Sequence, residues 1–212
     1  MNILNIISNL GRGGAESTLL KILLNDQSNK HIVISLKKDG ELAEIIKNNN
    51  IQLYELNFKF YNIFIYYKIG KIILKNRPDI IQTWMYHADF IGLIYRFIFN
   101  IKCLWCVRTG TLKFSLNNII AIIIRKICAI ISNFSHDKII YCSYNSKVLH
   151  EKIGYNKNSS IVIPNGYDTN YFNKKLIIKN KLRNNYKLED DAVILGLVGR
   201  LHEQKNHIFF LE

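Results

Sequence analysis

The sequence predicts an α/β fold in which a parallel sheet is flanked by helices on both faces. Short apolar runs rich in Ile, Val and Leu alternate with segments of helical periodicity over residues 1–165. A glycine-rich loop follows the first apolar run, as at the strand-to-helix turn of a Rossmann-like domain. With 212 residues, of which 49% are hydrophobic, the chain can hold one large domain or two small ones.

The expected elements follow one another along the chain. Strands are expected at 3–8, 31–36, 51–56, 80–84, 102–107, 138–143 and 161–163. Helices are expected up to Leu24, at 41–48, around the lysines of 58–77, up to Phe99, at 116–133 and at 146–153. A further apolar run, 192–198, is expected to be a buried strand, followed by a helix that begins near Asn206.

The formal net charge of +13 is high for a chain of this length. Such a charge favours anionic partners, namely nucleic acid, membrane headgroups or phosphorylated substrates. No helix-turn-helix, zinc-finger or RNP pattern occurs, so we do not expect a nucleic-acid partner.

The four cysteines lack the spacing of a disulfide framework. Cys103 and Cys106 lie three residues apart in an expected strand, which puts them on opposite faces of the sheet. No second pair of ligands accompanies them, so the sequence does not predict zinc. Residues 1–8 carry no basic leader, and no apolar run reaches the roughly 17–20 residues of a membrane span. We therefore expect a cytoplasmic protein with reduced cysteines.

The first glycine loop, which contains Gly13 and Gly14, stands at the start of an expected helix. It is not a dinucleotide fingerprint, because Glu16 occupies the place of the third glycine, and no Gly-Lys-Ser/Thr of a phosphate-binding P-loop follows. Backbone amides at a helix N-terminus can bind a phosphate, although a tight turn would use the same glycines.

A second candidate phosphate cradle follows the apolar run 192–198. Gly199 ends that run, and Arg200 and Lys205 add two cations just before the expected helix. Arg can grip two phosphate oxygens, and Lys supplies a mobile point charge. An ordinary basic strand-to-helix turn remains the alternative.

Two other segments allow more than one interpretation. His87 follows the strand at 80–84, at the edge where open α/β sheets bind ligands, although such a histidine can equally serve local hydrogen bonds. In 58–77, Lys68, Lys71 and Lys75 share one helical face beside aromatic residues. That face suits either a lipid headgroup layer or ordinary solvation.

Four strings in this order resemble motifs of glycosyltransferase family 4, of the kind found in surface-polysaccharide assembly. They are Gly13-Gly14-Ala15-Glu16, Gln82-Thr83-Trp84-Met85-Tyr86-His87-Ala88-Asp89, Ile163-Pro164-Asn165-Gly166 followed by Phe172, and Val198-Gly199-Arg200-Leu201 with Lys205-Asn206. The resemblance implies a GT-B fold of two Rossmann-like domains. The first domain would cover 1–165, a linker 166–190, and an incomplete second, nucleotide-sugar-binding domain 191–212.

The resemblance also implies an activity. A sugar would pass with retention from a nucleotide-diphosphate sugar to a lipid-linked or surface-glycan acceptor, as in lipopolysaccharide synthesis. It implies no cofactor and no obligatory metal, and a cytoplasmic protein that is peripheral on the inner face of the membrane. An anionic membrane surface is therefore a further expected partner.

The resemblance assigns roles to nine residues. His87 would be the catalytic residue that reaches the donor sugar or its phosphate. Three pocket residues would lie near it: Asp89, Arg108 and Asn165. The donor phosphates would be bound by Gly13, Gly14, Gly199, Arg200 and Lys205.

The sequence departs from the family in one respect, because it contains no Glu-x7-Glu pair of the kind that grips the donor ribose. We therefore expect little or no transferase activity from these 212 residues as a fragment. Two alternatives stay open: a non-catalytic remnant that binds acceptor or anionic membrane, and another GT-B enzyme such as a sugar epimerase or phosphorylase.

Overall fold

The computed structural model describes most of the chain and divides it into two compact units, Met1–Asn165 and Gly166–Glu212. The described residues are 1–110, 112, 119–134, 137–170, 172, 181–189, 191–199, 201 and 205–212.

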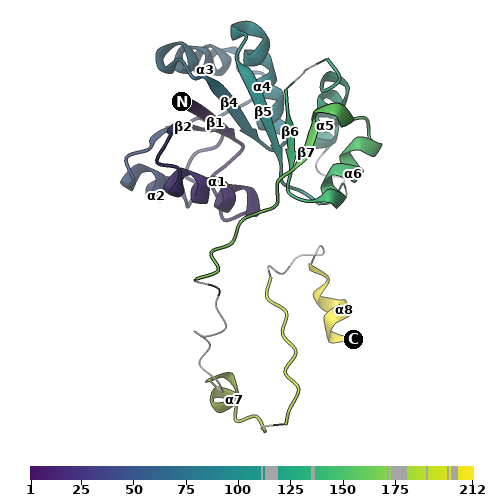
Figure 1. Ribbon diagram of the computed structural model, residues 1–212. Coiled ribbons are helices and arrows are strands. Elements are labelled where there is room, and N and C mark those ends of the chain that lie inside the picture. The colour runs from purple at the N-terminus through teal and green to yellow at the C-terminus, as the bar shows by residue number, and fades with distance from the viewer. Residues whose placement is uncertain are drawn as a thin grey trace. The chain divides into compact units, whose positions relative to one another are not determined.

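The first unit is built on a seven-stranded sheet with the order β3-β2-β1-β4-β5-β6-β7, in which every pairing is parallel (Figure 1). The pairing of β1 with β4 runs from Ile3↔Ile80 to Ile7↔Trp84. This architecture confirms the predicted α/β fold. The strands are β1 (Asn2–Ile7), β2 (Lys30–Ser35), β3 (Gln52–Glu55), β4 (Ile80–Trp84), β5 (Lys102–Val107), β6 (Ile139–Tyr141) and β7 (Ser160–Val162).

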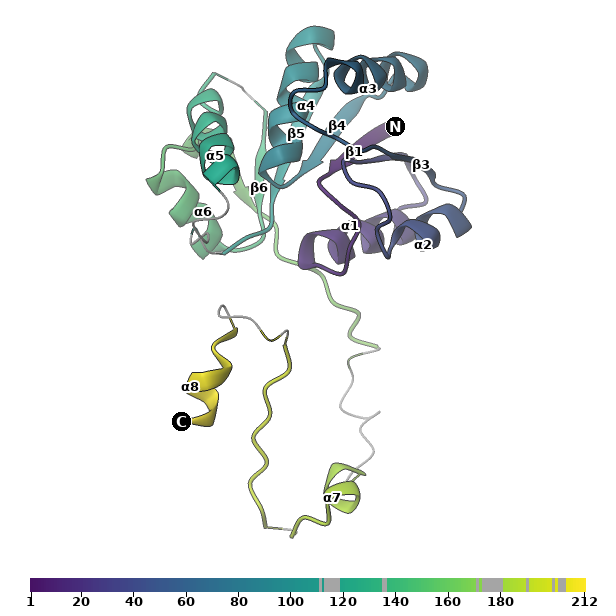
Figure 2. The same cartoon turned by 180° about the vertical axis from the view of Figure 1, so that it is seen from behind.

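Helices cover both faces of the sheet, as predicted (Figures 1 and 2). Buried residues of α1 (Gly14–Asn25) and α2 (Ala43–Asn48) pack on one face. The other face carries α3 (Ile63–Asn76), α4 (Tyr86–Phe99), α5 (Ile119–Ile131) and α6 (Tyr144–Lys152). The helices lie on different faces because parallel crossover connections are right-handed. The connections after β1 and β2 lead toward one edge of the sheet, and those after β4 to β6 lead toward the other.

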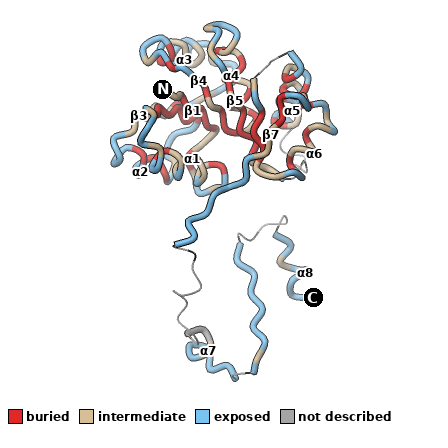
Figure 3. Tube along the Cα trace, in the orientation of Figure 1, coloured by how far each residue is buried: buried red, intermediate tan, exposed pale blue. Residues whose placement is uncertain are grey.

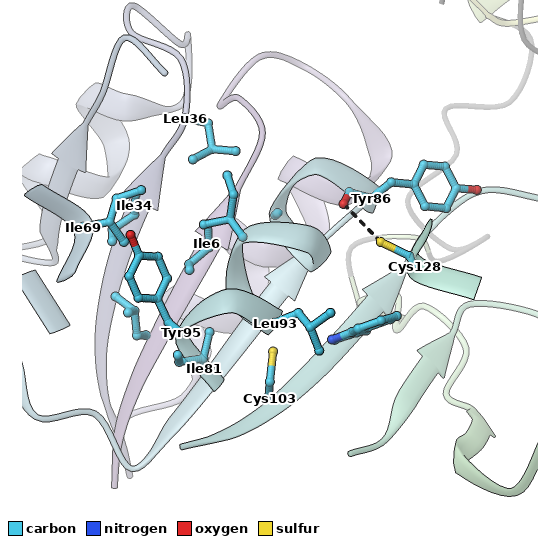
Figure 4. Close-up of a cluster of buried hydrophobic side chains, with 14 of the residues drawn as sticks. Ile6, Ile34, Leu36, Ile69, Ile81, Tyr86, Leu93, Tyr95, Cys103 and Cys128 are labelled. Atoms are coloured by element: carbon cyan, nitrogen blue, oxygen red, sulfur yellow. Dashed lines mark hydrogen bonds between the residues drawn. The ribbon is translucent and has the colours of Figure 1, made fainter. Parts of the chain in front are cut away.

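Two hydrophobic clusters, one on each side of the sheet, form the core of the first unit. In Figure 3 the buried residues follow the strands of the sheet. Figure 4 shows Ile6, Ile34 and Ile69 of the larger cluster gathered next to Tyr95. Strands that are buried on both faces are rich in branched apolar residues, which explains the Ile residues of β1, β2 and β4.

Cys103 and Cys106 confirm the alternation expected of a strand, because Cys103 belongs to the larger cluster and Cys106 to the smaller one. Their thiols point to opposite sides of the sheet and cannot share a metal ion. All four cysteines are free thiols. No group of three or more metal-ligating side chains occurs among the described residues. Within the same residues, every helix is too short or too polar to cross a membrane.

In the second unit the structure contradicts one prediction. Residues 192–198 form no strand, and 193–198 are exposed, with Val193 at 86% and Val198 at 99%. An apolar run becomes a buried strand only if another strand pairs with its backbone and another layer covers its side chains. The described part of this unit offers only α7 (Lys181–Tyr186) and α8 (His207–Leu211), so the run has neither.

Candidate functional site

The carboxyl ends of all seven strands lie at one edge of the sheet, because every pairing is parallel. The connection from β1 leads to β2 on one side, whereas β4 leads to β5 on the other. The topological switch point of the sheet therefore lies between the ends of β1 and β4, which is the position at which open α/β sheets bind their ligands. Two loops border it: residues 8–13 after β1 and Met85 after β4.

The loop after β1 presents the N-terminus of α1 to this edge. The side chain of Asn9 accepts a hydrogen bond from the Gly11 amide at 2.9 Å, and the Gly13 amide donates to the Gly11 carbonyl at 3.2 Å. Gly13 is the N-cap residue of α1 and provides no side-chain cap. The Gly13 amide is therefore paired with the Gly11 carbonyl, whereas no side chain caps the first turn of α1. Anion binding at Gly13 and Gly14 stays a prediction.

Glu16 already places a negative charge at this helix end. A Cβ atom added at Gly13 would collide with the Glu16 carboxylate, so that carboxylate lies directly against the glycine. This position is favourable for an acid, since the helix dipole is positive here. A phosphate that approaches the Gly13 amide has to displace the Glu16 side chain. Gly14, by contrast, is exposed and has open space where a Cβ would stand.

Met85, between β4 and α4, has a backbone conformation that is almost confined to glycine, with φ 73° and ψ 161°. Such a conformation costs about 1–3 kcal/mol and persists only where surrounding contacts impose it. Here the Met85 amide donates to the Cys106 carbonyl at 3.2 Å, and its carbonyl accepts from the Asp89 amide at 3.0 Å. The strain turns the chain sharply, so that Tyr86 points into the core and His87 falls in the first turn of α4.

His87 is half-buried at the start of α4, and its ring centroid lies 5.8 Å from that of Phe60. Burial, followed by the positive charge of Lys37, lowers the pKa of His87 below its usual value. The imidazole is therefore neutral at pH 7 and can accept one hydrogen bond while it donates another. This state suits contact with a hydroxyl or phosphate better than electrostatic binding.

Asp89 is buried inside the protein, although the sequence interpretation placed it at the pocket. It lies on the buried side of α4, and its carboxylate accepts a 2.6 Å hydrogen bond from the Thr83 hydroxyl. Burial raises the pKa of Asp89 to about 7. Its second carboxyl oxygen has no hydrogen-bond partner among the described residues. Asp89 can therefore act on a ligand only indirectly, by joining the end of β4 to the first turn of α4.

Arg108 and Asn165, two of the predicted pocket residues, are in contact at the carboxyl edge of the sheet. Their role in a ligand pocket stays a prediction. The Nη1 atom of Arg108 donates to the side-chain oxygen of Asn165 at 2.8 Å. The guanidinium lies 5.3 Å from the ring centroid of Trp84, and the Arg108 amide donates to the sulfur of Met85 at 3.3 Å. Arg108 thus links the ends of β4, β5 and β7 and brings a cation beside the strained turn.

The remaining predicted residues lie in the second unit. Gly199 and Lys205 are exposed and adjacent, since a Cβ at Gly199 would stand 3.3 Å from the Cγ atom of Lys205. Arg200 lies outside the described residues.

A buried pair behind the site was not predicted. His150 is fully buried; its Nδ1 donates to the Ser146 carbonyl at 2.7 Å, so its Nε2 accepts from the Tyr86 hydroxyl at 2.7 Å. Burial lowers the pKa of His150, and burial also raises the pKa of Tyr86. Cys128 also donates to the Tyr86 carbonyl at 3.8 Å (Figure 4). These contacts anchor the residue that separates the strained Met85 from His87.

The parallel sheet with helices on both faces defines a Rossmann-like domain. Residues 12–171 match the model of Glycosyltransferase Family 4, and the chain belongs to this family. The family predicted from the four sequence motifs is thereby confirmed.

Solved structures of GT-B glycosyltransferases share the fold. HepE of Anabaena in complex with UDP is 21% identical with a TM-score of 0.70, and the match covers 88% of this chain and 50% of that one. A glycosyltransferase from Rickettsia africae is 19% identical with a TM-score of 0.70, covering 98% and 55%. Sucrose-phosphate synthase from Thermosynechococcus elongatus is 16% identical with a TM-score of 0.70, covering 96% and 57%.

The chain thus spans about half the length of these solved structures. A comparison with curated protein sequences found no match.

Proposed function

We propose that the first unit forms one wall of a glycosyltransferase site that binds a nucleotide-diphosphate sugar. The observation that carries this proposal is the position of three features at the carboxyl edge of the sheet. They are the N-terminus of α1 at Gly13 and Gly14, which has no side-chain cap, the neutral His87 behind the strained Met85, and the Arg108–Asn165 pair. The structure of HepE with UDP-glucose supports the choice of ligand class.

In the proposed reaction, the bond between the anomeric carbon and the diphosphate oxygen breaks, and the diphosphate leaves with the electron pair. An acceptor hydroxyl forms the new bond to the same carbon, with retention of configuration, and its proton passes to the leaving diphosphate. The main demand on the protein is to stabilise negative charge on the leaving diphosphate. A hydrogen-bond donor preorganised for this purpose lowers the activation barrier by ~3–4 kcal/mol. No cofactor or metal is required in this scheme.

The residues have distinct proposed roles. His87 orients the donor sugar through hydrogen bonds, since its lowered pKa keeps the ring neutral. The amides of Gly13 and Gly14 bind phosphate oxygens after Glu16 has moved away and the Gly13 amide has released the Gly11 carbonyl. For Gly199, Arg200 and Lys205 of the second unit, binding of the donor diphosphate remains the role that the family resemblance implies. Asp89 supports the turn that holds His87, because it is buried and bonded to Thr83.

We propose a lipid-linked or growing surface glycan as the acceptor, with the protein peripheral on the inner face of the cytoplasmic membrane. Transfer by these 212 residues alone is expected to be below detection, because the sequence lacks the Glu-x7-Glu pair.

Titration of the isotopically labelled chain with UDP-glucose, followed by NMR, tests the proposal. We expect shifts at the Gly13 and Gly14 amides and at the His87 ring, and none at Asn29, which lies at the opposite edge of the sheet. His87→Ala should weaken binding by about tenfold, whereas Lys30→Ala at the opposite edge should leave it unchanged. Shifts confined to the edge near Asn29, or none at all, would refute the proposed site. Isomerisation of the sugar without an acceptor would instead indicate an epimerase.

A further inference from the structure

Helix α3 has one face in the core and one face that carries an unusual pattern. Ile69, Ile72 and Ile73 are buried against the sheet. The opposite face is exposed and carries two rows of side chains, which follow from the 100° rotation per residue of an α-helix. The first row is apolar and consists of Ile63 at 75% exposure, Tyr67 at 63% and Leu74 at 60%. The second row is basic and consists of Lys68, Lys71 and Lys75.

The charge of this region has one sign. Residues 56–78 contain no Asp or Glu. They contain five basic residues: Lys59, Lys68, Lys71, Lys75 and Arg77. None of the five forms an ion pair with a carboxylate within the described part of the chain. The Lys71 ammonium lies 4.6 Å from the ring centroid of Tyr67, so the basic and apolar rows are in direct contact.

The positive surface continues into a hollow of about 410 Å³ at the N-terminal end of α3. Lys38, Lys59 and Lys68 line it together with Tyr61. The one carboxylate in the lining, that of Glu55, is bonded to the Lys47 ammonium at 2.6 Å and to the Asp39 amide at 3.1 Å. The hollow is therefore basic and wide enough for a phosphate-bearing headgroup.

We propose that the outward face of α3 docks this protein on an anionic lipid bilayer. Aromatic and aliphatic side chains beside lysines are the composition of helices that lie in a headgroup layer. Ile63, Tyr67 and Leu74 enter the boundary between headgroups and acyl chains. Lys68, Lys71 and Lys75 bury their aliphatic stems there and direct their ammonium groups to lipid phosphates.

Two other partners fit this face less well. A nucleic acid would neutralise the lysines but leave the apolar row in water. A second copy of the chain would bury the apolar row but bring identical lysine rows together, because a twofold interface pairs a surface with itself. A lipid bilayer satisfies both rows at once.

The docking face leads to the proposed transferase site. Phe60, in the loop that precedes α3, has its ring centroid 5.8 Å from that of His87 and 6.4 Å from that of Phe90. Docking thus brings the bilayer close to His87, which suits a lipid-linked acceptor; this last step alone rests on the proposed function.

Vesicle flotation with the complete 212-residue chain tests the docking. The probe is a mixture of phosphatidylglycerol and phosphatidylcholine, compared with phosphatidylcholine alone. Each lysine near an anionic surface contributes about fivefold to partitioning, so Lys68→Gln/Lys71→Gln/Lys75→Gln should reduce binding about 100-fold. The matched control is Lys30→Gln/Lys152→Gln/Lys157→Gln, which removes the same charge from exposed residues elsewhere in the first unit and should retain binding within about threefold.

A second variant tests the apolar row. Ile63→Ser/Tyr67→Ser/Leu74→Ser keeps every charge and changes only exposed side chains, so it should fold normally, as circular dichroism will verify. We expect it to bind anionic vesicles more weakly, most clearly at high salt, where the lysine contribution is screened.

Several results would overturn the docking proposal. Equal loss of binding in the two lysine-to-glutamine variants would indicate an effect of net charge alone. Unchanged binding of the Lys68/Lys71/Lys75 variant, or equal binding of the parent chain to neutral vesicles, would also contradict the proposal. So would a dimer that the Lys68/Lys71/Lys75 variant dissociates while no vesicle binding occurs. UDP-glucose affinity is measured separately on the same variants. Absence of vesicle binding with intact UDP-glucose binding would contradict the docking proposal alone. Vesicle binding without UDP-glucose binding would contradict the proposed transferase site alone.

Discussion

Strand β5 of the first unit and residues 192–198 of the second are similar apolar runs, yet they have opposite environments (Figure 3). Cys103, Trp105 and Val107 of β5 are at most 2% exposed. In the second run, Val193 and Val198 are 86% and 99% exposed. β5 pairs with β4 and β6, whereas 192–198 pairs with nothing among the described residues. Apolar composition therefore selects candidate strands, but pairing partners decide which of them become buried.

The largest expected effect tests this comparison directly. Leu4→Ala, at a fully buried position of β1, should lower the free energy of unfolding by about 2–5 kcal/mol, because it creates a cavity. Leu195→Ala, at a position that is 78% exposed, should change it by less than about 0.5 kcal/mol. Urea denaturation of both variants measures the difference. A comparable cost at Leu195 would show that 192–198 is buried in solution.

Burial in the first unit also extends to a carboxylate, which makes stability depend on pH. The pKa of Asp89 rises from 3.8 to about 7 on folding. The stability associated with protonated Asp89 is therefore fully present below about pH 4 and is lost as the pH rises toward 7. Between about pH 4 and pH 8 the free energy of unfolding of the parent should fall by up to about 4 kcal/mol because of Asp89, and Asp89→Asn should remove this change. Denaturation at pH 4 and pH 8 measures it, and a variant with the same pH dependence as the parent would contradict the assignment.

Two glycines extend the comparison to tight and open surroundings. A Cβ at Gly92 of α4 would meet the methyl group of Thr83 and, at 3.0 Å, the sulfur of Cys103. Gly92→Ala should therefore cost about 1–3 kcal/mol through overpacking. Gly14→Ala meets no atom within 4 Å and should change stability by less than about 1 kcal/mol, in the stabilising direction. Thermal denaturation of the pair checks the order; a larger loss at Gly14 would be inconsistent with this geometry.

The smallest expected effect concerns the half-buried His87. Burial is the main cause of its lowered pKa, and Lys37 is the second. Lys37→Ala should therefore raise the pKa of His87 slightly, while burial keeps it below the usual value. NMR titration of the His87 ring measures the change, with Lys30→Ala as a control that should have none. No difference between the two variants would exclude Lys37 as a cause.

The candidate site was partly accessible to sequence reasoning. Gly13, His87, Arg108 and Asn165 follow or border strands of a parallel sheet, so a common edge could be predicted for them, and the structure places them there. Asp89 follows the same pattern but is buried, because its position on α4 faces the sheet.

The structure also adds residues for which the sequence carried no signal. The φ of Met85 depends on its hydrogen bond to Cys106 of a neighbouring strand, and His150 meets Tyr86 across 64 residues of chain.

The sequence by itself determined the alternation of strands and helices, the opposite faces of Cys103 and Cys106, and the basic, aromatic character of 58–77. These features depend on local periodicity and composition, which are present in every short segment. Only the tertiary structure decided the strained turn at Met85, the burial of Asp89 and the exposure of 192–198. Each of these depends on which distant segments pair or pack together, and the free energy of that contact is not contained in any one segment.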